Sequence, residues 1–79
     1  MTKLEERLLE LGYQDYQYYY QKTRWINDTF VIVQISKDLK GSIKDLFVNS
    51  QEHINNIQQA YNEMQKDLAV LKEVLENDN

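Results

Sequence analysis

The C-terminal third of the chain carries the pattern that constrains the fold most. From residue 54 to residue 75 the apolar side chains are spaced 3, 4, 3, 4, 3 and 4 residues apart, at Ile54, Ile57, Tyr61, Met64, Leu68, Leu71 and Leu75. The remaining positions are mostly Gln, Asn, Glu, Lys and Asp, and the chain contains no proline. Such a heptad pattern predicts an amphipathic helix over residues 51–76.

The predicted helix is too long for one small sheet to cover. A helix of about 25 residues extends about 37 Å, whereas a strand of about seven residues covers about 23 Å. Either an N-terminal helix packs beside the overhang, or another chain does. The heptad spacing suits packing on the chain's own sheet, a helix pair between chains, or a mixture of the two. In the mixture we expect a homo-oligomer, with a dimer favoured, whose seam holds Met64, Leu68, Leu71 and Leu75.

A short helix is predicted near the start of the chain, over residues 3–11. Thr2, followed three residues later by Glu5, is a capping-box pattern that satisfies free backbone N–H groups. Three leucines at helical spacing form one face. Gly12 supplies the residue that helices favour just past their end.

The middle of the chain predicts an antiparallel meander. Residues 16–24 are rich in tyrosine, residues 29–36 are β-branched and apolar on both faces, and Asn27 and Asp28 between them favour a turn. A third strand is expected over residues 42–48, with a short helix as the alternative. The apolar pattern of residues 29–36 on both faces is typical of a central strand that is covered on both faces. It also fits a strand that is covered on one face and partly covered by its neighbours on the other. We therefore predict a single α+β domain in which the long helix packs on a two- or three-stranded sheet.

Composition limits the classes of protein that remain. A chain of 79 residues has room for one domain. There is no cysteine to form a disulfide, and His53 is the only histidine, so neither a metal nor another cofactor is expected. The longest apolar run is four residues, far from the ~20 that cross a bilayer. We expect a cytoplasmic protein with no membrane contact.

Charge is distributed unevenly along the sequence. Six basic and six acidic residues balance within residues 1–40, whereas residues 41–79 hold three basic and seven acidic residues and so carry the whole net charge of −4. Binding to a phosphate backbone depends on clustered Lys and Arg. The charge therefore disfavours nucleic acid as a partner of the second half of the chain.

Residues that could carry catalysis are few. No serine nucleophile sits in a recognisable motif, and two glycines are too few for a phosphate-binding loop. His53 beside Glu52 could act as a base with its orienting group, but a solvated pair in the first turn of the helix is the simpler interpretation. Glu63 and Asp67 lie four residues apart and could hold a cation, although a solvated face is again simpler. The sequence predicts no enzyme.

The stretch YQYYYQKTRW, residues 16–25, is the one conspicuous aromatic cluster. In a strand, Tyr16, Tyr18 and Tyr20 point one way and Tyr19 the other. Such a face could stack nucleic acid bases, or it could pack under the long helix with its hydroxyls at the rim. We favour the packed face. The candidates for outward contact with a protein are then Tyr19, Lys22, Arg24 and Trp25.

The chain as a whole resembles a loosely defined group. Its opening LEERLLELGY, the tyrosine-rich hairpin and the closing INNIQQAYNEMQKDLAVLK look like small uncharacterised proteins encoded by phages and prophages of Gram-positive bacteria. The closing helix carries most of the likeness, and the motifs are structural. The resemblance implies a protein that binds a host or phage protein in the host cytoplasm, and it brings no site residue with it.

The sequence therefore predicts a non-enzymatic protein that acts by protein–protein interaction and self-associates through its C-terminal helix. Two alternatives stay open. The acidic half could mimic nucleic acid and inhibit a host nucleic-acid-binding or defence enzyme, or the tyrosine-rich hairpin could bind single-stranded nucleic acid weakly.

Overall fold

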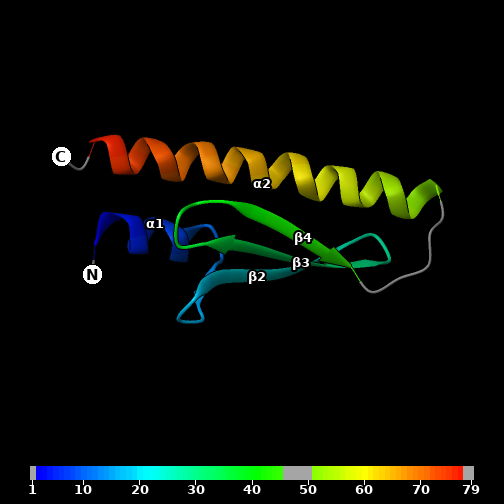
Figure 1. Ribbon diagram of the computed structural model, residues 1–79. Helices are drawn as coiled ribbons and strands as arrows, with labels where there is room; N and C mark the ends of the chain where they lie inside the picture. Colours follow the sequence, from blue (N-terminus) through cyan, green and yellow to red (C-terminus); the bar gives the residue numbers. More distant parts are fainter. Residues whose placement is uncertain (1, 46–50, 78–79) are drawn as a thin grey trace.

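The sheet and two helices form two layers (Figure 1). The computed structural model describes residues 2–45 and 51–77. The elements follow in the order α1 (Lys3–Glu10), β1 (Gln14–Asp15), β2 (Tyr19–Ile26), β3 (Thr29–Ser36), β4 (Gly41–Asp45) and α2 (Gln51–Asn77). The strands form one antiparallel sheet in the order β1-β2-β3-β4. The predicted α+β fold is confirmed, with four strands instead of two or three.

Both ends of α1 follow from local sequence signals. The Thr2 hydroxyl accepts a hydrogen bond from the Glu5 amide at 3.1 Å, as the capping pattern predicts. At the other end Gly12 has φ +95°, in the left-handed region, and its amide donates to the Leu9 carbonyl at 3.0 Å. The Tyr13 amide donates to the Leu8 carbonyl at 2.9 Å, which completes a Schellman cap. The cap ends the helix and turns the chain into the sheet.

The core lies between the sheet and α2. Alternation along β3 places Val31, Val33 and Ile35 under the helix, where all three are buried. The helix covers them with side chains spaced along its lower face, at Ala60, Met64, Leu68 and Leu71. Gly41 on β4 lies directly beneath Met64, so close that a Cβ atom there would stand 2.5 Å from the Met64 sulfur. The helix therefore rests almost on the backbone of the edge strand.

The overhang of α2 lies beside α1 of the same chain. Helix α1 lies beside the last turns of α2 (Figure 1), and a groove of about 400 Å³ between the two is lined in part by Val70 and Val74. Leu8 of α1 is buried in the common core. Of the two arrangements that the helix length allowed, the structure adopts the one in which the N-terminal helix packs beside the overhang.

The structure corrects the predicted tyrosine strand. Strand β2 begins at Tyr19, not at Tyr16, because Gln17 adopts φ +77° and its amide donates to the Asp15 carboxylate at 2.9 Å. This turn takes Tyr16 and Tyr18 out of the alternation, and they are 45% and 75% exposed. Of the predicted tyrosine face, Tyr20 alone lies in the core.

The third predicted strand is β4, which fixes the choice between strand and helix for residues 42–45. The remaining residues of that prediction, 46–48, lie outside the described residues. The hairpin turn at Asn27 and Asp28 is present as expected, because Ile26 pairs with Thr29 across it.

Candidate functional site

The face of the sheet opposite α2 is left uncovered by the two helices (Figure 1). Its side chains come from alternate positions of β2, β3 and β4, and the strand register groups them into cross-strand neighbours. We call this surface the open face. Its residues are Tyr19, Gln21, Thr23, Trp25, Phe30, Ile32, Gln34, Ser36, Ser42 and Lys44.

Aromatic rings occupy both ends of the open face. Trp25 is 62% exposed, and its ring meets Phe30 edge-on with centroids 5.1 Å apart. At the other end Tyr19 stacks on Tyr16 of the preceding turn, with centroids 5.6 Å apart and planes 12° apart. Both geometries are favourable aromatic arrangements. They fix large apolar rings at a surface that solvent reaches.

The centre of the open face is polar but uncharged. The Gln34 amide donates to the Gln21 side-chain oxygen at 2.9 Å, so each amide satisfies part of the other across β2 and β3. Ile32 lies half-buried between this pair and the Trp25 end. Among the described residues of the open face, Lys44 alone is charged. The open face thus has aromatic rings at its ends, hydrogen-bonded amides at its centre and its charge on an edge strand. This composition is typical of the core of a protein–protein interface.

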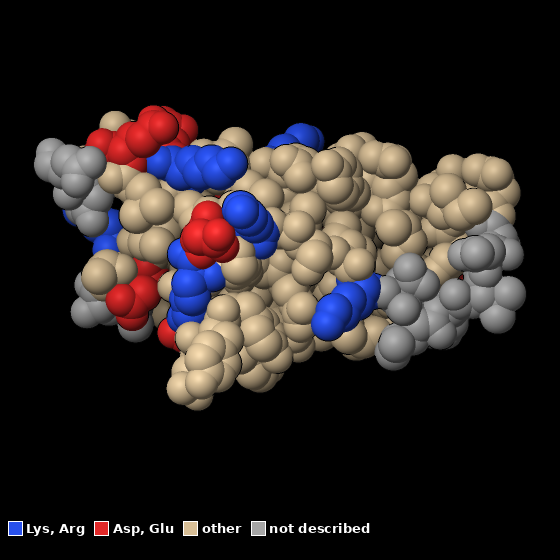
Figure 2. Space-filling model, viewed as in Figure 1, with Lys and Arg blue, Asp and Glu red and all other residues tan. Residues whose placement is uncertain are grey.

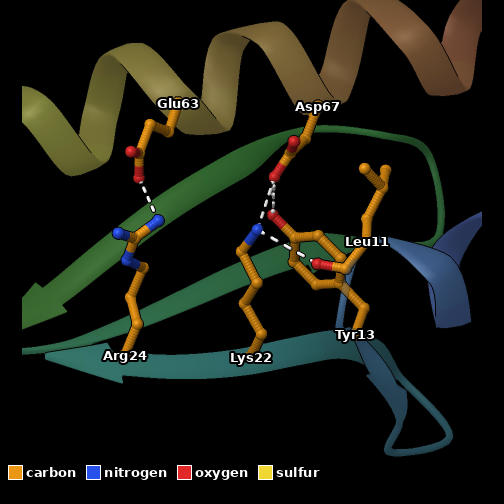
Figure 3. A network of polar contacts seen from close by, with 6 residues as sticks. All are labelled: Leu11, Tyr13, Lys22, Arg24, Glu63 and Asp67. Carbon is orange, nitrogen blue, oxygen red and sulfur yellow. Dashed lines mark hydrogen bonds and ion pairs between the residues drawn. The ribbon is translucent and has the colours of Figure 1, made fainter.

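The two predicted outward cations lie on the opposite face. Lys22 and Arg24 project from β2 towards α2 (Figure 3). They therefore do not join Tyr19 and Trp25, which lie on the open face. The reason is the twofold period of a strand: residues 22 and 24 share their side with the buried Tyr20, whereas 19 and 25 have the other parity. Strand alternation can be read from the sequence numbers alone. The prediction that placed all four residues in one contact set did not apply it.

Lys22 is held in a partly buried network (Figure 3). Its Nζ lies 2.7 Å from Asp67 Oδ2 and 3.3 Å from the Leu11 carbonyl oxygen, and 4.6 Å from the centre of the Tyr13 ring. The Tyr13 hydroxyl donates to the same Asp67 oxygen at 2.9 Å. Burial, together with the hydrogen bond and negative charge of Asp67, raises the pKa of Tyr13. The network ties α2, β2 and the end of α1 together.

Arg24 makes a second ion pair one helical turn away, with Glu63. Its Nε is buried without a hydrogen-bond partner. Two residues along a strand span about 6.6 Å, and four residues along a helix span about 6 Å. The spacing of the two cations along β2 therefore matches the spacing of the two carboxylates along α2. Glu63 and Asp67, which the sequence assigned to a solvated face, instead pair with the protein's own cations.

A buried polar cluster holds the first turns of α2 on the hairpin. The Asn56 amide donates to the Thr29 hydroxyl at 2.9 Å, and that hydroxyl lies 3.1 Å from His53 Nδ1. The Asn27 amide donates to the Asn56 side-chain oxygen at 2.9 Å. Thr29, His53 and Asn56 are all buried. His53 therefore lies in the core and not in the solvated pair that the sequence suggested, and its side chain is engaged in packing α2.

The predicted oligomer seam is used inside the chain. Met64, Leu68 and Leu71 are buried against the sheet, while Leu75 is exposed. The buried positions of α2 are His53, Asn56, Ala60, Met64, Leu68 and Leu71. From residue 53 to residue 71 the chain advances 18 residues in five turns, or 3.6 per turn, the period of a straight helix on a sheet. The heptad pattern has a period of 3.5, so its outer members Ile54 and Tyr61 fall on the exposed flank.

Charged side chains are unevenly distributed over the surface seen from the side (Figure 2). In the view of Figure 2, charged side chains gather over the end that carries α1 and the last turns of α2. The surface towards the first turns of α2 is mostly uncharged in that view.

In the described part of the chain no group of three or more His, Asp or Glu residues could hold a metal ion. No helix among these residues is long and apolar enough to cross a membrane.

Comparison of the chain with protein-family models, curated proteins and solved structures found no match.

Proposed function

We propose that this chain is a non-enzymatic protein that acts by binding a host or phage protein through the open face, in the host cytoplasm. The observation that carries the proposal is the exposure of Trp25 beside Phe30 on a sheet surface almost free of charge. Tryptophan and tyrosine are enriched among the residues that dominate binding energy at protein interfaces. Their rings are held here by stacking and edge contacts, so little side-chain freedom is lost on binding.

Nucleic acid fits the open face less well than protein does. Strand-binding proteins combine stacking rings with a track of cations. The two cations nearest the rings in sequence, Lys22 and Arg24, are paired with carboxylates on the other side of the sheet. The same pairing removes Glu63 and Asp67 from any acidic surface that could imitate nucleic acid. Binding of single strands therefore loses the two cations nearest the rings, and nucleic-acid mimicry loses two of the seven acidic residues of 41–79 on which it depended.

A photo-crosslinking experiment tests the proposal. A benzophenone amino acid replaces Thr23, an exposed residue of the open face, and in a matched control it replaces Gln59, an exposed residue of α2. Each variant is expressed in the cell that makes the protein and irradiated. The proposal expects discrete protein adducts from position 23 that position 59 does not give. Adducts that a nuclease removes, no adducts, or identical adducts from both positions would contradict it.

A further inference from the structure

We infer that the partner on the open face is a second copy of the chain, packed sheet against sheet about a twofold axis. The inference rests on the proposed function, because it names the occupant of the same surface. It replaces the helix seam as the place where two copies would meet.

The distribution of charge favours a second copy. Two copies that each carry a net charge of −4 repel one another on most approaches. The open face contains one charged residue, Lys44, and it lies on the edge strand β4. Contact through this face sets no carboxylate of the open face against a carboxylate of the other copy. The acidic helices α2 then lie on the two outer sides of the pair, a full sheet thickness from the contact.

The central strand supports the same partner. On β3 the residues Val31, Val33 and Ile35 are covered by α2, whereas Phe30 and Ile32 reach the open face half-buried. On the open face the first half of β3 is apolar and the second half, Gln34 and Ser36, is polar, so the apolar segment that a partner could cover is the one beside Trp25. Two open faces packed about 10 Å apart would cover it, with strands crossing at about 30° as in aligned sheet packing. The result is a four-layer helix–sheet–sheet–helix pair.

The area of the open face sets the strength of the contact. Strands β2 and β3, of eight residues each, are about 26 Å long, and β4, of five, is about 17 Å long; at a width of about 4.8 Å per strand they give a flat footprint of roughly 330 Å². Two such footprints bury about 700 Å², to which the projecting rings add, so the pair falls below the ~1,200 Å² of stable interfaces and among weak, transient contacts. We therefore expect a dimer that dissociates on dilution in the micromolar range, not an obligate one.

Trp25 is the only tryptophan of the chain and lies on the open face, so its emission reports this contact directly. Sedimentation equilibrium and Trp25 fluorescence are measured together over a concentration series. The inference expects a mass that rises from monomer towards dimer, and a blue shift of the emission maximum over the same range. A monomer mass at high micromolar concentration would overturn it.

Matched charge variants locate the contact. Thr23→Glu places a like charge on both open faces and should raise the dissociation constant by about tenfold or more, and Thr23→Lys should do the same. Gln59→Glu adds the same charge to α2 and should leave the dissociation constant unchanged. Far-ultraviolet circular dichroism checks that each variant is folded. A dimer that survives both Thr23 variants but is lost in Tyr61→Glu would place the contact on the helix flank and overturn the inference.

The crosslinking experiment separates this inference from the proposed function. An adduct of twice the chain mass from position 23 supports the second copy and the use of the open face as a protein contact. Adducts with other proteins alone overturn the second copy and leave the protein-binding function standing. The absence of any position-specific adduct overturns both.

Discussion

Replacing Asp67 with asparagine tests whether the cations of β2 belong to the fold. The change keeps the shape of the side chain and one acceptor oxygen but removes the charge that Lys22 and Tyr13 meet. The Lys22 and Asp67 side chains are 15% and 14% exposed. Breaking a fully buried ion pair costs about 3–5 kcal/mol. Because some water reaches this pair and asparagine still accepts one hydrogen bond, we expect Asp67→Asn to cost about 2–3 kcal/mol.

That loss is large for a chain of this size. At about 0.05–0.15 kcal/mol per residue the whole domain has a free energy of unfolding of about 4–12 kcal/mol. Glu63→Gln is the matched control, because Glu63 pairs with Arg24 one turn away and both side chains are about a third exposed. Partly exposed pairs contribute about 0.2–1 kcal/mol. The control should therefore cost less than half as much as Asp67→Asn.

Urea unfolding followed by circular dichroism at neutral pH measures both variants. The free energies are compared at equal m-values, so that a change in the unfolded state is not mistaken for a change in the pair. Equal, small losses for the two variants would refute the reasoning. They would mean that Lys22 is not held by Asp67, and that its assignment to the helix side of the sheet contributes little to the fold.

Two further predictions concern the core. Gly41→Ala should lower the free energy of unfolding by about 1 kcal/mol, because the new Cβ displaces the flexible end of Met64 and lies 3.1 Å from Leu68. Thermal unfolding measures this loss. Unchanged stability would show that α2 does not rest on β4. The raised pKa of Tyr13 means that the folded chain keeps a proton that the unfolded chain loses above about pH 10. Below about pH 10, Tyr13 should therefore leave the free energy of unfolding of the wild-type protein independent of pH. Above about pH 10 it should lower that free energy, by at most about 1.4 kcal/mol per pH unit. Tyr13→Phe should lack that contribution, and wild-type and variant curves that stay parallel above pH 10 would contradict it.

The parts of the fold that local chemistry determines could be predicted from the sequence. The first helix is set by Thr2 and Gly12, whose cap geometries involve only neighbouring residues. The extent of α2 follows from the spacing of its apolar residues, and the hairpin turn follows from Asn27 and Asp28. The beginning of β2 could not be predicted, because Gln17 in a left-handed conformation is uncommon for a side chain of its kind. That conformation removes Tyr16 and Tyr18 from the strand.

The candidate site could be predicted only in part. Strand alternation, a local rule, puts Tyr19 and Trp25 on one side of β2, and both lie on the open face. The same alternation separates Lys22 and Arg24 from them, and the prediction that grouped all four did not apply it. Their pairing with Asp67 and Glu63 could not be predicted, because these partners lie about 40 residues away on α2. The buried face of α2 departs from the predicted heptad pattern in its first turns, where Ile54 is exposed and the polar residues His53 and Asn56 are buried. Their burial depends on hydrogen bonds to Thr29 that only the folded chain supplies.

The most direct test of the open face as the contact surface is residue-resolved. Amide and indole resonances of uniformly ¹⁵N-labelled protein are recorded on dilution from high to low micromolar concentration. The account predicts concentration-dependent shifts for the Trp25 indole and for the amides of Thr23 and Ile32, with none along the exposed side of α2. Resonances that do not move, or shifts confined to Ile54 and Tyr61 on the helix flank, would contradict it.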